Sequence, residues 1–344
     1  MASDPLSVRA PAAVRAQAAC ATLIEFRPAL PLRNRHLQSL LGSLPPLARQ
    51  ARRRAAALLA VSQPLLLACG QGVRLQAFHS RAPGARRLAV LLHGWESSAD
   101  SSSVLSLGGL LYQHGFDVLR LNLRDHGDSH HLNREIFHSC RLPEVIGALQ
   151  AVAQLSAPIP LYLAGFSLGG NFMLRAAADV GLPGAVTGVV AISPVLDPAA
   201  TLRALEQAPA LYRRNLIRRW SRSLQRKQRA WPGVHDFSGL LPLADLRCMT
   251  ASLVRGHTQF PDLEAYLQGY AITERRLAEV RVRCSLLLAE DDPLIPAADL
   301  ARLAPSPRLR LWRSRYGGHC GFLQRWGSPS MADRFVLEQF ESFG

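Results

Sequence analysis

The sequence contains no apolar run close to the roughly 20 residues that a membrane-spanning helix needs, which argues against an integral membrane protein. Its first twenty residues include an early acid and no continuous apolar core, so they do not have the pattern of a secretory signal. Charged residues make up only 19% of the 344-residue chain, and 48% of it is hydrophobic, which excludes extensive disorder. We therefore expect a folded, soluble, cytoplasmic protein.

Cysteine is also sparse, with six residues at positions 20, 69, 140, 248, 284 and 320. None of them forms a CxxC pair, and their scatter over a long chain is not that of a disulfide framework. We expect separate reduced thiols, which most often pack as small apolar side chains.

Acidic residues are few, at 25 against 40 basic ones, and the formal net charge is +15. Lys227 is the only lysine, so arginine carries this charge, and a codon bias toward arginine and alanine explains it as well as an anionic partner does. The segment 203–231 is far more basic than the rest. We expect peripheral contact between this segment and an anionic membrane surface, and no nucleic-acid partner. Oligomeric state is not visible in the sequence.

Strand and helix patterns alternate from about residue 65 onward. Residues 64–80 are typical of a hairpin, and apolar runs ending near residues 95, 127, 167, 197, 295 and 319 are typical of strands. Helical patterns fill 101–115, 142–155, 168–180, 296–304 and 329–343. Repeated βα units predict an α/β fold with a mostly parallel central sheet and helices on both faces.

The alternation breaks between residues 200 and 275, where the sequence is basic, helical in pattern and without strand signals. We predict that this segment is a helical cap inserted into the sheet domain. The predicted organisation is an N-terminal extension packing on the core (1–64), two parts of the core (65–199 and 276–344) and the cap (200–275).

The stretch GFSLG places Ser167 between two glycines, where a predicted strand meets a predicted helix. A serine nucleophile held on a sharp turn requires this context, because the turn lifts the hydroxyl above the sheet and aims a helix N-terminus at the reacting atoms. His319, after the last predicted strand, is the candidate base. Asp292 is favoured as the carboxylate that orients it, with Asp291 left open as the alternative.

Acyl transfer also needs N–H donors for the oxyanion. The residue after the nucleophile, Leu168, supplies one, and we assign the second to Trp95 in the loop that follows the strand LAVLL. We expect His93 to brace that loop by hydrogen bonding and to transfer no proton. This reaction needs neither a metal nor an organic cofactor.

The sequence resembles the YheT-like branch of the α/β-hydrolase superfamily, whose members have a Ser, Asp, His order along the chain. The resemblance covers about residues 25–344. It rests on the stretches PALPLRNRHLQSLL, LLHGWESSADSSSVLSLGGLL, VLRLNLRDHGDS, FHS, GFSLGGNF and GGHCGFL. It implies a serine hydrolase of carboxylic esters, with Ser167 as nucleophile, Asp292 as acid and His319 as base. Asp125, Cys140 and the turn ACGQG depart from the family pattern, which bears on substrate rather than mechanism.

Three other interpretations stay open at this point. An acyltransferase would use every one of these residues, and a basic cap without an aligned triad would leave a non-catalytic protein that binds anionic lipid. The histidines and aspartates of 124–131, with His138, also resemble the ligand cluster of a metallohydrolase. Over these three alternatives, we favour an esterase that acts on lipid or acylglycerol esters.

Overall fold

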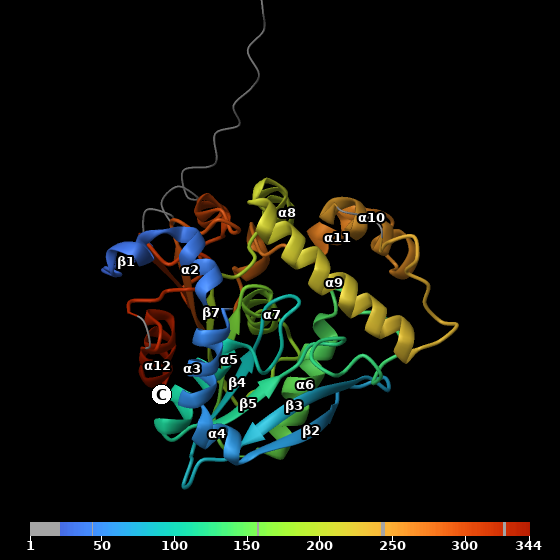
Figure 1. The fold of residues 1–344 in the computed structure, drawn as a ribbon. Coiled ribbons are helices and arrows are strands. Elements are labelled where there is room, and N and C mark those ends of the chain that lie inside the picture. Colours follow the sequence, from blue (N-terminus) through green and yellow to red (C-terminus); the bar gives the residue numbers. More distant parts are fainter. Residues whose placement is uncertain (1–20, 43, 157, 242–244, 326–327) are drawn as a thin grey trace, which may run out of the picture.

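A single nine-stranded sheet forms the centre of the protein (Figure 1). The computed structural model describes residues 21–42, 44–156, 158–241, 245–325 and 328–344. The strand order is β1-β9-β8-β7-β6-β4-β5-β3-β2. Neighbouring strands are parallel from β1 through β5, whereas β3 is antiparallel to β5 and β2 is antiparallel to β3. The strands are β1 (Thr22–Ile24), β2 (Ser62–Ala68), β3 (Arg74–Ser80), β4 (Leu88–Leu92), β5 (Asp117–Leu121), β6 (Leu161–Phe166), β7 (Val186–Ile192), β8 (Arg283–Ala289) and β9 (Leu309–Ser314). The predicted mostly parallel sheet is confirmed.

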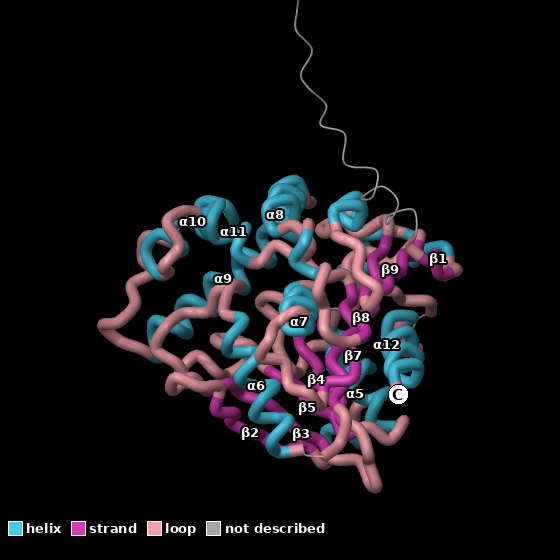
Figure 2. The backbone as a smooth tube through the Cα atoms, turned by 180° about the vertical axis from the view of Figure 1, so that it is seen from behind, coloured by secondary structure: helices cyan, strands magenta, loops and turns pink. Residues whose placement is uncertain are grey.

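Helices cover both faces of this sheet, as predicted (Figure 2). Helices α6 (Leu142–Leu155) and α7 (Leu168–Ala177) pack on one face, and α5 (Ser102–Gln113) and α12 (Met331–Phe343) pack on the other. All five residues of β4 are buried, because a parallel strand covered on both faces has no solvent side. The carboxyl ends of the parallel strands all point to one edge of the sheet, where loops gather.

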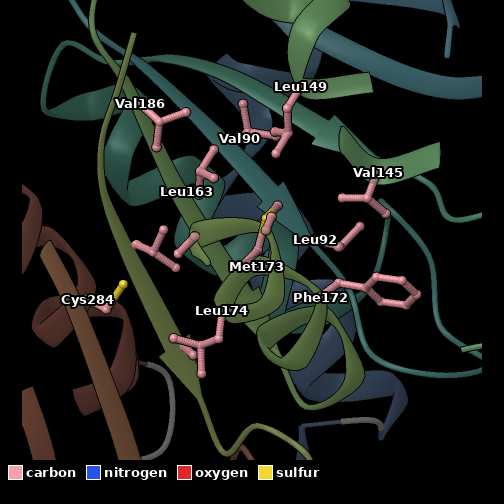
Figure 3. Packing of buried hydrophobic residues seen from close by; sticks show 14 of the residues in the cluster. Val90, Leu92, Val145, Leu149, Leu163, Phe172, Met173, Leu174, Val186 and Cys284 are labelled. Carbon is pink, nitrogen blue, oxygen red and sulfur yellow. The ribbon is translucent and has the colours of Figure 1, made fainter. Parts of the chain in front are cut away.

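The core under α6 and α7 is made of branched aliphatic and aromatic side chains (Figure 3). Val90 and Leu163 project from adjacent strands toward Leu149 of α6 and Met173 of α7, and all four are fully buried. Burying each such side chain contributes about 1.5–3 kcal/mol to folding. This packing fixes the strand β6 and the helix α7, which flank Ser167.

Two local expectations have different outcomes. The hairpin predicted over 64–80 is confirmed by the antiparallel pairing of β2 with β3. The helix predicted over 296–304 is wrong in type, because the chain forms a short 3-10 helix, η3 (Ala297–Arg302). Pro296 precedes this segment and Pro305 follows it, and Pro305 disfavours a helical conformation at Ala304, so the helical turns end before that residue.

The segment before β2 adds a strand and several short helices to the core. β1 pairs with β9 at one edge of the sheet, which the sequence pattern did not predict. A 3-10 helix, η1 (Leu30–Arg33), and the helices α2 (Arg35–Leu41), α3 (Pro45–Arg54) and α4 (Ala56–Ala60) follow, and α3 lies against α5. Asn34 caps α2 by accepting hydrogen bonds from two N–H groups of its first turn.

Among the described residues between β7 and β8, the chain forms four helices and a short 3-10 helix. They are α8 (Pro198–Gln207), α9 (Ala210–Ala230), α10 (Leu246–His257), α11 (Leu263–Gly269) and η2 (Arg275–Leu277). Their apolar faces share a cluster that includes Leu202, Trp220, Leu253 and Tyr266. These helices overlap the predicted cap (200–275), and from here on we use the name cap for residues 198–277, which contain them. No described helix, in the cap or elsewhere, combines the length and apolar character that crossing a bilayer requires.

The single lysine of the chain fastens the cap to the core. Lys227, on α9, is only 2% exposed and donates hydrogen bonds to Oδ1 of Asp125 at 2.9 Å and to the carbonyl of Asn133 at 2.5 Å. Burial lowers the pKa of Lys227 and raises that of Asp125, and each charge offsets part of this cost for the other. Asp125 has a φ of 57°, a left-handed conformation that aspartate tolerates better than most residues.

Replacing Lys227 with methionine is expected to lower the free energy of unfolding by about 3–5 kcal/mol, because Asp125 would remain buried without its partner. Urea denaturation measures this change. Arg229 is exposed and lies two residues along the same helix, so Arg229→Met should change the free energy of unfolding by less than about 0.5 kcal/mol. The double variant Lys227→Met/Asp125→Asn should recover much of the loss. Equal stability of Lys227→Met and Arg229→Met would contradict a structural role for the pair.

Candidate active site

Ser167 lies at the junction of β6 and α7, on a sharp turn. Its φ of 52° and ψ of −117° are strained for a residue with a Cβ atom. The strain holds the hydroxyl above the carboxyl edge of the sheet. The N-terminus of α7, with N–H groups that have no partner inside the helix, begins at the next residue, Leu168.

The two glycines of the GFSLG motif are required by backbone contacts. A Cβ atom on Gly165 would lie 2.4 Å from the backbone of Gly169, and one on Gly169 would lie 2.4 Å from the carbonyl oxygens of Leu92 and His93. No side chain fits at such distances. These glycines therefore let α7 approach the end of β4, which brings the β4 loop beside Ser167.

The structure brings Ser167, His319 and Asp292 together, although they are far apart in the sequence. The Ser167 hydroxyl lies 3.0 Å from Nε2 of His319, and Nδ1 of the same ring lies 3.0 Å from Oδ2 of Asp292. Because Asp292 can only accept while ionised, Nδ1 carries the proton and Nε2 is free to accept from the hydroxyl. The Asp292 side chain is fully buried, and its Oδ1 accepts hydrogen bonds from the N–H groups of Leu294 and Ile295.

The groups beside the imidazole favour its protonated form. Burial disfavours the imidazolium, but the Asp292 carboxylate and the adjacent Cys320 together outweigh burial and raise the pKa of His319 well above its usual 6.5. The neutral ring, which accepts the serine proton, is the form present above this pKa. The second aspartate, Asp291, has no hydrogen bond to the imidazole within the described residues, and its Oδ1 accepts the N–H of Gly318 at 2.8 Å. Of the two carboxylates that the sequence left open, Asp292 contacts the ring and Asp291 supports the loop that carries it.

The residues assigned to the oxyanion site border Ser167. Leu168 is the first residue of α7, and Trp95 follows Gly94, where a Cβ atom would lie 3.2 Å from the Cβ of Ser167. His93 braces this loop as expected, because its Nδ1 donates to the carbonyl of Gly94 at 2.7 Å and its Nε2 accepts from the N–H of Leu123 at 3.2 Å. Burial lowers the pKa of His93 well below its usual value, so the ring is neutral.

Helix α2 positions the His319 loop, which sequence reasoning missed. The N–H of His319 donates to Oγ of Ser39 at 2.8 Å. Gln38, fully buried, donates through its Nε2 to the carbonyl of Leu323 at 3.0 Å and accepts from the N–H of Leu323 at 2.7 Å. The stretch NRHLQSLL is part of the family resemblance, but periodicity does not indicate contacts between positions 280 or more residues apart.

A cavity of about 380 Å³ opens beside Ser167 and His319. The cap contributes several leucines to its apolar wall, including Leu202, Leu216 and Leu253. His138 also lines it: its side chain is buried, its Nδ1 has no hydrogen-bond partner within the described residues, and burial lowers its pKa to about 3. The cavity thus combines an apolar interior with polar groups near the hydroxyl, as in sites for small organic ligands.

The other candidate residues have structural partners. Within the described ranges, no three His, Cys, Asp or Glu side chains are arranged to hold a metal ion. In the 124–131 segment, Asp125 pairs with Lys227, and Nε2 of His126 accepts the N–H of Glu96 at 3.1 Å. The five described cysteines are free thiols. Cys20 lies outside the described residues.

The profile of a family described as "Alpha/beta hydrolase family" matches residues 89–332, which is more than half of the sequence. The chain belongs to the alpha/beta hydrolase family. The match contains all three residues of the Ser167, Asp292 and His319 constellation. The YheT-like branch is a finer assignment that this match does not test.

Among curated proteins, human Protein ABHD15 is 27% identical to this alpha/beta hydrolase over 187 residues, which are 53% of this chain. The aligned region is 40% of ABHD15, so the chain matches less than half of that relative's length. The resemblance is therefore partial.

Solved alpha/beta hydrolases share the fold at low identity. The Pyrococcus furiosus esterase Pf2001 superposes with a TM-score of 0.54 and 16% identity, covering 82% of this chain and 92% of the esterase. A membrane phospholipase A described as a bacterial virulence factor gives a TM-score of 0.57 and 16% identity over 90% of this chain and 94% of the phospholipase. These likenesses establish the fold.

Proposed function

We propose that this protein is a serine hydrolase that cleaves carboxylic esters through an acyl-enzyme. The hydrogen-bonded series Ser167, His319, Asp292 carries the proposal, because it supplies a nucleophile, a base and an orienting carboxylate at 3.0 Å intervals. The neighbouring apolar cavity supports it by offering room for an acyl chain. Membership of the YheT-like branch is part of the same proposal.

The mechanism follows from the geometry. Nε2 of His319 accepts the proton of Ser167 as its oxygen attacks the ester carbonyl, and the Asp292 carboxylate stabilises the imidazolium that forms. The N–H groups of Leu168 and Trp95 hold the oxyanion, each being worth about 3–4 kcal/mol to the transition state. The imidazolium then protonates the departing alcohol. Water, deprotonated by the same imidazole, cleaves the acyl-enzyme and restores the hydroxyl.

The cap favours lipid or acylglycerol esters as substrates. Its leucines line the cavity, and each buried methylene of an acyl chain gains about 0.8 kcal/mol. Leu211, at the start of α9, is 68% exposed, and Leu37, on α2, is 42% exposed. We propose that these exposed leucines, with the arginines of α9, let a cytoplasmic protein take substrate from an anionic membrane surface.

A series of p-nitrophenyl esters of increasing chain length tests the function. We expect kcat/KM to rise by about threefold to fourfold per methylene until the cavity is filled, and then to level off. Long-chain monoacylglycerol, offered in anionic and in neutral vesicles, tests the membrane contact in the same assay. No turnover of any ester, together with no labelling by a fluorophosphonate, would leave a binding protein instead. Ester products formed with a competing alcohol would indicate an acyltransferase.

A further inference from the structure

A second cavity, of about 310 Å³, lies between α9 and the loops that follow β4 and β5. Figure 1 shows α9 running across the core on this side. Three arginines of α9 line the cavity: Arg219, Arg222 and Arg226. Their spacing of three and four residues places them on one face of the helix, so all three guanidinium groups border the same cavity.

Two of these arginines are fixed to the core through backbone contacts. Arg219 donates to the carbonyl of Glu96, and Arg226 donates to the carbonyl of Gly127 at 3.5 Å. A guanidinium has five N–H donors, so most of them remain available. Arg222, between the two, has no hydrogen bond or ion pair within the described part of the chain.

The acidic groups near this cavity do not balance three guanidinium charges. Asp125 is already paired with Lys227. Asp128 is 96% exposed and lies 3.9 Å from Arg226, a loose contact that water screens. Burial raises the pKa of Glu96 to about 8, so this carboxyl is largely protonated at neutral pH. The cavity is therefore positively charged.

The arginine cavity adjoins the candidate active site. Ser97, Ser101 and Arg219 line both cavities. The loop between them, which begins at Trp95, also carries a proposed oxyanion donor. The two cavities therefore share part of their lining, so a polar group carried by an ester bound at Ser167 would lie near the arginines.

We propose that Arg219, Arg222 and Arg226 form a binding site for a phosphate group, and that this group is carried by the ester substrate. This step rests on the proposed esterase function, whereas the anion site itself does not. Guanidinium groups bind phosphate oxygens through paired, charge-assisted hydrogen bonds, and the serine hydroxyls of the shared loop supply further donors. Substrates would be acyl esters of a phosphate-bearing alcohol, with the acyl chain in the apolar cavity.

Titration calorimetry with sn-glycerol 3-phosphate, in a buffer free of phosphate, tests the site without any turnover. We expect the wild-type protein and Arg218→Ala to bind alike, since Arg218 is exposed on α9 and lines neither cavity. Arg222→Ala should bind at least about tenfold more weakly, because one charge-assisted contact is lost. Absence of binding to the wild-type protein, or equal binding to Arg222→Ala, would overturn the proposal.

A pair of substrates then identifies the source of the phosphate. The ratio of kcat/KM for 1-oleoylglycerol 3-phosphate to that for 1-oleoylglycerol should fall about tenfold in Arg222→Ala and stay constant in Arg218→Ala. A constant ratio in both variants, with Arg222-dependent calorimetric binding, would overturn the substrate assignment and leave a site for free phosphate compounds. Calorimetric binding in a protein with no esterase activity would keep the anion site and reject the proposed function.

Discussion

Ser167→Ala is expected to lower kcat for ester hydrolysis by on the order of 10⁵-fold, because removing a catalytic serine removes the covalent route. Labelling by a fluorophosphonate, which requires an activated serine oxygen, should disappear as well. The hydroxyl contacts the His319 ring and its loss leaves the backbone turn in place, so the folded structure should persist. Thermal unfolding within a few degrees of wild type would verify this.

Ser193 provides a matched control for that experiment. It also follows a parallel strand, β7, and it also has a positive φ, of 45°. Its Oγ accepts the N–H of Cys320 at 3.4 Å, and within the described residues it has no hydrogen bond to the imidazole. Ser193→Ala should keep fluorophosphonate labelling and most of the esterase activity. Persistent labelling of Ser167→Ala, or loss of labelling only in Ser193→Ala, would reject Ser167 as the nucleophile.

Asp292→Asn is expected to lower kcat by about 10⁴-fold, because the amide leaves His319 in the wrong tautomer and without a counter-charge. The pH profile should shift as well. A protonated His319 cannot accept the serine proton, so kcat/KM falls as the pH drops through the pKa of His319, which lies above 6.5 in the native protein. Removing the carboxylate charge lowers this pKa and moves the acid limb to lower pH.

The variant Asp291→Asn distinguishes the roles of the two aspartates in catalysis. An asparagine keeps the Oδ1 acceptor for the N–H of Gly318, so this variant should lose less than about tenfold in kcat and keep the position of its acid limb. The comparison requires kcat/KM from about pH 5 to 9 for both variants. A loss in Asp291→Asn as large as that in Asp292→Asn would mean that the wrong carboxylate had been assigned.

The sequence predicted the parts of this protein that local chemistry determines. A buried parallel strand has a recognisable apolar run, and the GFSLG motif follows from two positions, Gly165 and Gly169, that admit no Cβ atom. The order of Ser167, Asp292 and His319 along the chain then suggested one site, and their side chains meet at the carboxyl edge of the sheet. The apolar strand run and the GFSLG motif are each contained within a few residues.

Interactions between distant segments could not be predicted in this way. Nothing in the neighbourhood of Gln38 indicates that its amide binds the chain at Leu323, and nothing near Lys227 indicates that it reaches Asp125. Such pairs are created by the tertiary fold, whereas apolar periodicity reports only which face of one element is covered. The departure of Asp125 from the family pattern was visible in the sequence, but its role as partner of the cap was not.

The attachment of the His319 loop to α2 has a consequence for biosynthesis. Ser39 leaves the ribosome 280 residues before His319, and the His319 loop stays in place through contacts between these two segments. The reactive serine consequently has no base until the His319 segment has been synthesised and has docked on α2. Hydrolytic competence would thus arise in one step, and a nascent polypeptide that ends before residue 319 would be inactive.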